Sequence, residues 1–381
     1  MKHLVYVKKR NLEWQETSDP VLHSPTDALV RPFAVARCDL DNAFLNRDLG
    51  ILMNAAARAH YLDPRVIKDL GDRPFDGPFP YGHECVAEVL SVGSEVTGFE
   101  RRDVVIVPFQ ISCGRCLTCA AGKTAHCETN RTSSISAYGF GNPTGAWGGA
   151  MADVVRVPFA DHMLVSVPDG VDAVGLASAS DNIPDGWRGV APHLQDRPES
   201  RVLVLGGQAR SVSLYAAGIA VALGAEQVDY VDTSEQRLQV ARKLGANCIA
   251  RKPGKSGWKQ LRKILANYPI VFDGCGQKEG LETAIRALAT TGVCTSATPY
   301  FRKRTAVPLW EMYSRSLRFE TGLANARACL PQIIDLVASG AFDPSIVTTL
   351  TADWSDAPHA LLDDGPKVVV TRERLKEPQS D

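Results

Sequence analysis

The sequence lacks a long apolar run, and it lacks an excess of charge of either sign. No stretch of its 381 residues approaches the roughly 18 apolar residues of a membrane span, so we expect no membrane partner. Lysine and arginine total 42 against 43 aspartates and glutamates, which leaves no basic surface for nucleic acid. Met1–Val5 open directly into a strand-like pattern, without the apolar core and cleavage site of a signal peptide, so we expect a cytoplasmic protein that acts on small molecules.

Internal repeats and low-complexity tracts are absent as well, and the length suffices for two domains. Up to about residue 167, short β-branched stretches alternate with Gly, Pro and Asp, which is typical of an irregular, mostly antiparallel β domain. From about residue 201 to 297, apolar strands alternate with helical segments, which is typical of a parallel sheet with covering helices. The predicted fold class is therefore α/β.

Ten cysteines are present, and four of them fall within one short segment, at Cys113, Cys116, Cys119 and Cys127. Four thiolates at this spacing predict a closed, tetrahedral site for a structural zinc ion. A disulfide pair fits less well because no secretory signal is seen. An iron–sulfur cluster fits less well because the fourth cysteine does not stand at the ferredoxin spacing. A nucleic-acid-binding zinc finger fits less well because the sequence has no basic surface.

The clearest βαβ pattern begins with the apolar strand Val202–Leu205. A helix over 212–223 follows, and a second strand over 227–231 delivers Asp232 at its carboxyl end. Ser234 is placed to cap the next helix. In a dinucleotide-binding fold, the turn between the first strand and its helix lies against the pyrophosphate. That turn consists of Gly206, Gly207, Gln208, Ala209, Arg210 and Ser211.

The glycine fingerprint of this turn is degenerate, because Gln208 and Ser211 replace its second and third glycines. A generic strand-turn-helix unit therefore stays open as an alternative to dinucleotide binding. Asp232 favours the dinucleotide, because a carboxylate there accepts hydrogen bonds from the ribose hydroxyls and repels a 2′-phosphate. We expect NAD rather than NADP, with Arg237 as a residue that could soften this preference.

Residue types that bind metals also stand at three separate places before the βαβ pattern. Taken singly, each has an ordinary structural explanation, such as a buried thiol, a core histidine or a helix-capping aspartate. Taken together with the cysteine segment, they resemble the zinc-dependent medium-chain alcohol dehydrogenase family along essentially the whole chain. The segments that carry the resemblance are Cys38, Gly82-His83-Glu84, the four cysteines, Trp147-Gly-Gly-Ala150 with Asp153, Val165-Ser-Val-Pro-Asp169, Asp181 and the unit that begins at Val202.

This resemblance implies a catalytic zinc ion held by Cys38, His83 and Asp181. Glu84 would be an adjacent carboxylate that can enter or leave the metal shell, and Asp41 a carboxylate that orients the ligand histidine. A zinc ion with three protein ligands and one open position suits the deprotonation of an alcohol, after which a hydride passes to nicotinamide. The chain is thus expected to hold a catalytic zinc, a structural zinc and NAD.

The resemblance also implies an architecture. A GroES-like, β-rich catalytic domain would comprise residues 1–180 and 322–381, and a Rossmann domain of residues 181–321 would bind NAD. Cys275 and Gly276 are expected at the cofactor site. The assembly is expected to be a homo-oligomer, either a dimer or a tetramer, and the substrate an alcohol, aldehyde or ketone.

The chain departs from the family pattern at the expected proton relay. Leu40 stands where most members have a serine or threonine that passes the alcohol proton towards solvent, and Ala43 stands where a histidine often continues the relay. An ordered water or Glu84 is expected to take the proton. Asp185 replaces a frequent threonine beside the nicotinamide, where its charge would stabilise the oxidised ring.

A third departure is the segment between Cys38 and His83, which is longer than is common in the family. It is expected to form a lid or substrate wall, with Phe75, Phe79 and Tyr81 as candidate contacts, or a surface excursion that packs on another subunit.

Two alternative functions stay open at this point. One is a zinc-dependent dismutase or reductase of small aldehydes in which the cofactor stays bound, because relatives of that kind combine an aspartate ligand with a long early insertion. The other is a catalytically impaired, zinc-stabilised nucleotide-binding or scaffold protein, because both the relay and the glycine turn have lost family residues.

Overall fold

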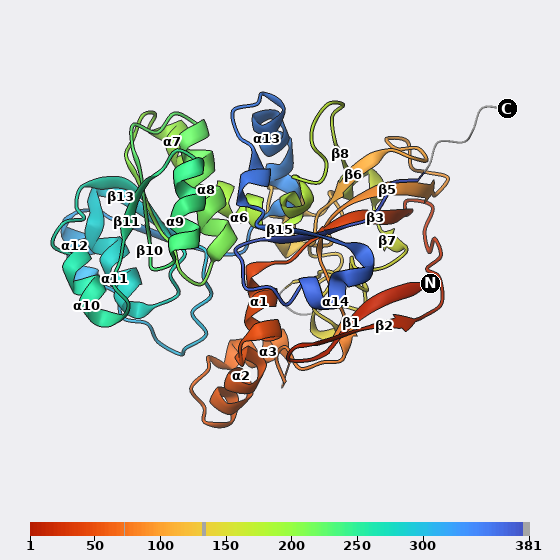
Figure 1. Ribbon diagram of the computed structural model, residues 1–381, viewed down its shortest axis with the longest axis horizontal. Helices are drawn as coiled ribbons and strands as arrows, with labels where there is room; N and C mark the ends of the chain where they lie inside the picture. The colour runs from red at the N-terminus through yellow and green to blue at the C-terminus, as the bar shows by residue number, and fades with distance from the viewer. Residues whose placement is uncertain (72, 132–134, 376–381) are drawn as a thin grey trace.

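The computed structural model of the chain describes residues 1–71, 73–131 and 135–375. Figure 1 shows two parts side by side, one built on a parallel sheet and the other on mainly antiparallel sheets. α6 (Asn182–Arg188) and α13 (Ala326–Ala338) lie between the two parts. Within the described ranges, no helix is long and apolar enough to cross a membrane.

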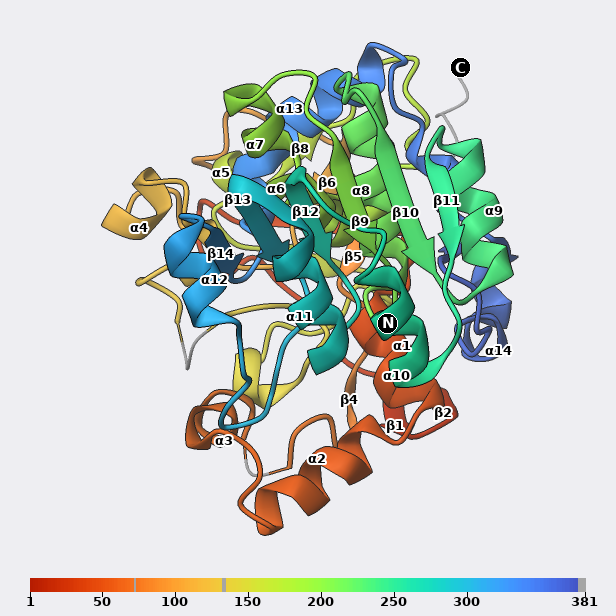
Figure 2. The ribbon, with the colours of Figure 1, turned by 90° about the vertical axis from the view of Figure 1, so that its left-hand side faces the viewer.

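The parallel sheet has six strands in the order β11-β10-β9-β12-β13-β14. Its strands are β9 (Val202–Leu205), β10 (Val228–Asp232), β11 (Asn247–Ala250), β12 (Tyr268–Asp273), β13 (Leu288–Ser296) and β14 (Arg318–Thr321). Figure 2 looks onto the face covered by α10 (Gly254–Leu261), α11 (Lys278–Ala287) and α12 (Leu309–Ser314). α8 (Arg210–Ala222) and α9 (Glu235–Lys243) cover the opposite face.

The burial of β9 follows from this double cover. Val202 and Val204 belong to the hydrophobic cluster that includes α8, whereas Leu203 and Leu205 belong to the cluster that includes α11. A strand covered on both faces has no solvent side, which is why its sequence is continuously apolar instead of alternating.

The other part contains a three-stranded and a seven-stranded sheet. The smaller sheet pairs β1 (Lys2–Lys8) with β2 (Asn11–Glu16) and β4 (Phe79–Pro80). The larger sheet runs in the order β15-β16-β3-β5-β6-β8, and β7 also pairs with β3. Its strands are β3 (Ala28–Ala36), β5 (Glu84–Val92), β6 (Val104–Val107), β7 (Val155–Val157), β8 (Val165–Ser166), β15 (Leu350–Asp353) and β16 (Val368–Thr371). β16 thus joins the end of the chain to β3, near its beginning.

The long segment between Cys38 and His83 is largely helical. It contains α1 (Asp39–Asn46), α2 (Leu49–Arg58) and α3 (Pro64–Leu70), and α2 and α3 project below α1 in Figure 1. The remaining helices are short, namely α4 (Leu117–Ala120), α5 (Ala160–Met163), α7 (Ala191–Asp196) and α14 (Ala357–Ala360).

The predicted α/β class is confirmed. The helix predicted from residue 212 begins two residues earlier, and Ser234 caps α9 by accepting a hydrogen bond from the Arg237 amide. α2 ends at Arg58, and His60 shortly after it has a φ of 57°. The domain boundaries at residues 180 and 321 stay predictions.

Candidate functional site

Three chain segments bring metal-ligand side chains together, and we call the group Cys38, His83, Glu84 and Asp181 the Cys38 cluster. Cys38 lies two residues after β3, and His83 lies just before β5. β3 and β5 pair antiparallel with Ala36 opposite Glu84. The end of one strand and the start of the next are therefore neighbours, although 45 positions separate the cysteine from the histidine in the sequence numbering.

Asp181 arrives from a different segment, directly after the short helix η3 (Ala177–Ser180). The Ser180 hydroxyl fixes this helix to β5, because it accepts a hydrogen bond from the Cys85 amide at 2.9 Å and donates one to the Cys85 carbonyl at 3.0 Å. This double contact carries Asp181 to the end of β5 where His83 lies.

The ligand atoms of the Cys38 cluster all lie within 4.8 Å of one another. Asp181 Oδ2 is 3.2 Å from Cys38 Sγ and 3.4 Å from His83 Nε2. His83 and Glu84 are almost fully buried, and Asp181 is 9% exposed. The cluster therefore has one accessible side.

The donor atoms fit a zinc ion. Four buried polar atoms of this site have no hydrogen-bond partner among the described residues, namely both ring nitrogens of His83, one oxygen of Glu84 and one oxygen of Asp41. Unpaired buried polar atoms are costly, so their convergence points to a missing partner. A thiolate, an imidazole and a carboxylate are the ligand types of catalytic zinc sites.

The ionisation behaviour of the cluster follows from burial and crowding. Burial raises the pKa of Cys38 well above its ordinary value, and the Asp181 carboxylate raises it further. Burial also raises the pKa of Glu84, to about 7, against the opposing effect of Lys367. For His83 burial acts downward, but the surrounding carboxylates, led by Asp41, raise its pKa to about 9. Excess negative charge in a closed space is what a bound dication would relieve.

Asp41 faces the histidine as expected, but it does not bond to it. Its Oδ1 lies 3.7 Å from His83 Nδ1, beyond hydrogen-bond distance. Its Oδ2 accepts hydrogen bonds from the Cys38 amide and the Tyr81 hydroxyl, both at 3.1 Å. The sequence analysis named Tyr81 as a candidate substrate contact, and this prediction is wrong. Its side chain is buried behind the cluster and does not line the cavity described below.

The four cysteines of the second cluster also converge. Their sulfur atoms lie within 4.8 Å of one another, around α4 and the following turn. A hydrogen bond from the Thr118 side chain is the main reason that the pKa of Cys116 falls to about 5, whereas burial raises that of Cys119 to about 12. All ten cysteines are free, so neither cluster is consumed by a disulfide.

His162, next to the cysteine cluster, should make stability depend on pH. Burial, helped by Arg327, lowers the pKa of His162 to about 4, so the folded chain binds fewer protons than the unfolded chain between that value and the ordinary 6.5. The stability that the neutral ring preserves is complete above about pH 6.5 and is lost as pH falls towards 4. We expect His162→Asn to weaken the dependence of the melting temperature on pH over this range. An unchanged dependence would show that His162 is not its cause.

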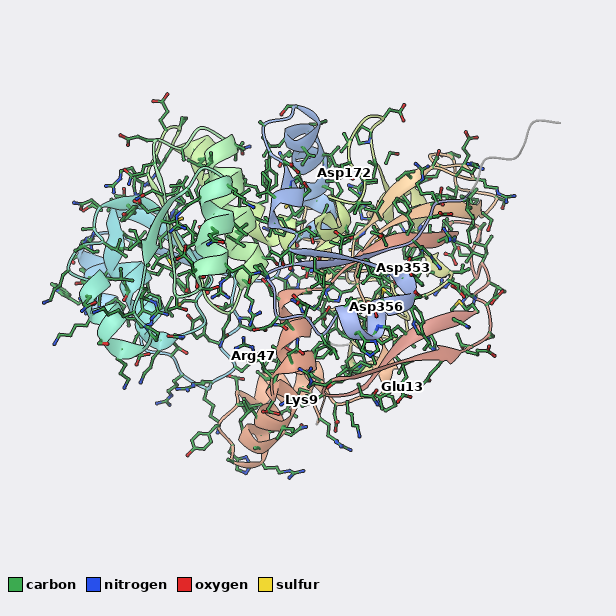
Figure 3. All side chains as sticks on the ribbon, in the orientation of Figure 1. Lys9, Glu13, Arg47, Asp172, Asp353 and Asp356 are labelled. Atoms are coloured by element: carbon green, nitrogen blue, oxygen red, sulfur yellow. The ribbon has the colours of Figure 1, made fainter. Side chains whose placement is uncertain are left out.

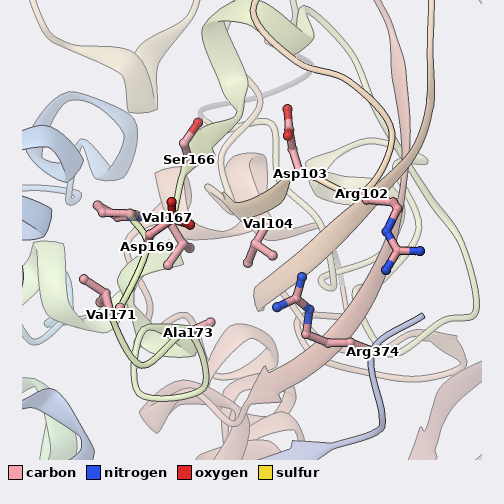
Figure 4. A pocket seen from close by; sticks show the side chains of 11 residues that line it. Arg102, Asp103, Val104, Ser166, Val167, Asp169, Val171, Ala173 and Arg374 are labelled. Atoms are coloured by element: carbon pink, nitrogen blue, oxygen red, sulfur yellow. The ribbon is translucent and has the colours of Figure 1, made fainter. Parts of the chain in front are cut away.

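A cavity of about 1210 Å³ lies beside the Cys38 cluster. Cys38 and Asp181 line it from one part of the molecule, and the turn between β9 and α8 lines it from the other. Of the predicted cofactor residues, Gly207, Gln208, Ala209, Arg210, Arg237 and Cys275 line this cavity, whereas Gly206, Ser211, Asp232 and Gly276 do not. A second cavity, of about 330 Å³, is lined by Arg102, Asp103, Arg374 and neighbours and includes no residue of either cluster (Figure 4).

The wall of the large cavity near the cluster is apolar and aromatic. Leu40 and Ala43 line it, so no hydroxyl or imidazole stands at the relay positions. Phe75 and Phe79, predicted from the long segment, also line it. Phe140, which the sequence did not single out, lies against His83 with ring centroids 4.5 Å apart.

Asp232 stands at the end of β10 as predicted, but its carboxylate is already bonded. Arg237 donates to both of its oxygens, at 2.7 and 2.6 Å. The Tyr230 hydroxyl donates at 3.0 Å, and the amides of Thr233 and Ser234 donate at 2.6 and 2.9 Å. A ribose hydroxyl at this carboxylate would have to displace one of these donors.

Asp185 lines the cavity and is tied to its own helix. Its carboxylate accepts a hydrogen bond from Arg188 Nε at 2.5 Å, and Arg188 also donates to the Ser296 carbonyl. Burial raises the pKa of Asp185 to about 6, against the opposing charge of Arg188. The charge that the sequence placed beside the nicotinamide is therefore partly neutralised.

Lys367 is the main site residue that sequence reasoning missed. Its ammonium is fully buried and donates to Glu84 Oε2 at 3.0 Å, to Asn182 Oδ1 at 2.8 Å and to the Arg37 carbonyl at 2.9 Å. A lysine directly before the apolar Val368–Thr371 strand was the available signal, since buried lysines occur almost only with partners.

Known zinc-type dehydrogenases are similar to this chain. Residues 24–169 match the family model of the alcohol dehydrogenase GroES-like domain, and residues 211–339 match that of the zinc-binding dehydrogenases. An uncharacterized zinc-type alcohol dehydrogenase-like protein, AdhB of Bacillus subtilis, is 25% identical over 97% of this chain and 100% of its own length. Glutathione-independent formaldehyde dehydrogenase of Bacillus subtilis is 37% identical over 50% of this chain and 47% of its own length.

The fold is similar to that of solved structures. Alcohol dehydrogenase TADH from Thermus sp. ATN1 superposes with a TM-score of 0.78 at 25% identity, covering 97% of this chain and 99% of that one. The fold and the matched domains define a zinc-binding oxidoreductase. More specifically, the chain belongs to the zinc-dependent alcohol dehydrogenase family of the medium-chain dehydrogenases/reductases.

Proposed function

We propose that this chain transfers a hydride between an alcohol, or the corresponding aldehyde or ketone, and NAD(H). The observation that carries this proposal is a single cavity lined both by predicted zinc ligands and by the predicted cofactor-binding turn. Cys38 and Asp181 line it on one side, and the turn residues Gly207 and Arg210 line it on the other. A reacting carbon at the cluster and a nicotinamide reaching from the turn would share this cavity, and their proximity favours hydride transfer.

In this proposal Cys38, His83 and Asp181 hold a catalytic zinc ion, and the four cysteines hold a structural one. When bound, a zinc ion with an open position acidifies an alcohol and polarises a carbonyl. Asp41 faces the unbonded Nδ1 of His83 at 3.7 Å and would fix the ring orientation after a small approach.

The proton must leave by another route than the usual hydroxyl. Leu40 and Ala43 offer no proton acceptor, whereas Glu84, a member of the cluster, has one buried oxygen with no hydrogen-bond partner among the described residues. Its other oxygen is held by Lys367. We propose that the free oxygen of Glu84, or an ordered water bonded to it, receives the alcohol proton.

NAD is the proposed cofactor, with Asp232 at the adenosine ribose. A carboxylate fixed at the end of β10 disfavours a 2′-phosphate, although Arg237 beside it lessens the repulsion. The experiment is a panel of alcohols and aldehydes, each tested with NAD and with NADP in zinc-loaded protein, followed by the absorbance of the reduced nicotinamide. Turnover with NAD and weaker use of NADP is expected. No turnover with any substrate would contradict the hydride-transfer assignment, and equal use of NADP would contradict the role of Asp232.

A second candidate is an aldehyde dismutase or reductase whose cofactor stays bound. The helical insertion with α2 and α3 favours it, because this segment supplies cavity residues Leu52 and Leu70, as does the half-length similarity to a formaldehyde dehydrogenase. Purified protein that carries stoichiometric nicotinamide through dialysis would support this candidate over the freely exchanging dehydrogenase.

A further inference from the structure

The N-terminus of α8 is capped by a residue from the other part of the molecule. Ala209 precedes the helix and has no side-chain oxygen to cap it. The Ser211 amide instead donates to both oxygens of Asp39, at 3.1 and 2.9 Å, the Ser211 hydroxyl donates at 3.0 Å, and the Val212 amide donates at 3.1 Å. Asp39 opens α1 and directly follows Cys38. A carboxylate therefore occupies the helix end at which a cofactor phosphate was expected.

A second carboxylate pairs with the cations beside the same turn. Arg210 donates from Nη1 to the Asp364 carboxylate at 2.9 Å and to its carbonyl at 2.7 Å. Arg47, labelled beside α1 in Figure 3, lies 3.6 Å from that carboxylate. Arg47 and Arg210 both line the large cavity.

The two carboxylates differ in how firmly they are held. The Asp364 side chain is 68% exposed, so it can turn towards solvent and release Arg210 and Arg47 to an incoming diphosphate. Asp39 is fixed by two backbone amides and a hydroxyl, and its removal would leave the first turn of α8 uncapped. Asp39 would therefore stay in place when a dinucleotide binds.

We propose that Asp39 is a positioning residue that limits the affinity of this chain for the diphosphate of its cofactor. It holds α8 against α1 and places a negative charge beside the turn on which the diphosphate lies, so that the cofactor exchanges in every turnover. The inference rests on the proposed function and deepens it, because it favours the exchanging dehydrogenase over the enzyme with permanently bound cofactor.

The test is the binding of ADP-ribose, which carries the diphosphate without nicotinamide, to the zinc-loaded protein by calorimetry. Asp39→Asn keeps an oxygen for the α8 donors and removes the charge, so its Kd for ADP-ribose should fall about tenfold while that for adenosine is unchanged. In turnover, KM for NAD should fall, and kcat should fall with it if release of the reduced cofactor limits the rate. Asp39→Ser serves as a second variant should the asparagine protein be unstable.

The matched control is Ser211→Ala, which removes one contact to Asp39 and leaves the charge. This variant should have a lower melting temperature but an unchanged Kd for ADP-ribose. Equal or weaker binding of ADP-ribose by both Asp39 variants would overturn the inference and leave Asp39 as a simple helix cap. If the unaltered protein binds neither NADH nor ADP-ribose, the proposed function itself fails and the inference falls with it.

Discussion

Replacing His83 by alanine is expected to lower kcat/KM by about a thousandfold or more, because the histidine supplies the only nitrogen donor of the Cys38 cluster among the described residues. The remaining thiol and carboxylates bind zinc too weakly to keep it. The four-cysteine cluster lies apart and should retain its ion. Elemental analysis is therefore expected to show about two zinc ions per chain in the unaltered protein and about one in the variant.

His193→Ala provides the control for loss of a buried histidine. His193 is 6% exposed and bonds to the Thr295 side chain at 3.1 Å, outside both clusters. That variant should lose stability but keep its full zinc content. Unchanged activity or unchanged zinc in the His83 variant would show that the cluster is not the catalytic site, and loss of both ions would show that the two clusters are not independent.

The sequence predicted those parts of the molecule whose residues are close along the chain. The four cysteines are such a case, because their ligand spacing is itself the signal. The unit from β9 to β10 is another, because an apolar strand, a turn and a helix stop carry local signals for each element. Asp232 could be placed at a strand end for the same reason.

Contacts between distant segments could not be predicted in this way. Asp39 caps α8 across 172 positions, and Lys367 reaches Glu84 across 283 positions. An aspartate at the start of α1 suggests only a contribution to its own helix, and nothing in the periodicity records a second helix end beside it. The hydrogen bond from Tyr81 to Asp41 could not be predicted either. A tyrosine at this place in the sequence suits a substrate wall and a buried position equally well.

The Cys38 cluster is an intermediate case. Cys38 and Glu84 become neighbours only through the pairing of β3 with β5, which neither segment encodes alone. Family resemblance supplied that long-range information, and the pairing supplies its physical reason. Family resemblance could not show that the Asp232 carboxylate is already bonded, because its five hydrogen bonds come from its own strand, the following turn and the next helix.

Replacing Lys367 by methionine is expected to lower the free energy of unfolding by about 3–5 kcal/mol, because it leaves the carboxylate of Glu84 buried without its cation. Methionine fills a similar volume, so the loss reflects charge and hydrogen bonding more than packing. Asn182 and the Arg37 carbonyl lose a donor in the same step. Chemical denaturation of the zinc-loaded protein measures the effect.

The double variant Lys367→Met with Glu84→Gln separates the ion pair from the rest of the network. A neutral amide removes the uncompensated charge, so the double variant should regain about half of the lost stability or more, giving a coupling energy of about 1–3 kcal/mol between the two positions. Strictly additive losses would mean that Lys367 acts only through Asn182 and Arg37. Coupling would instead identify Lys367 as the group that holds one oxygen of Glu84, leaving the unpartnered oxygen as the one directed to the metal and the alcohol proton.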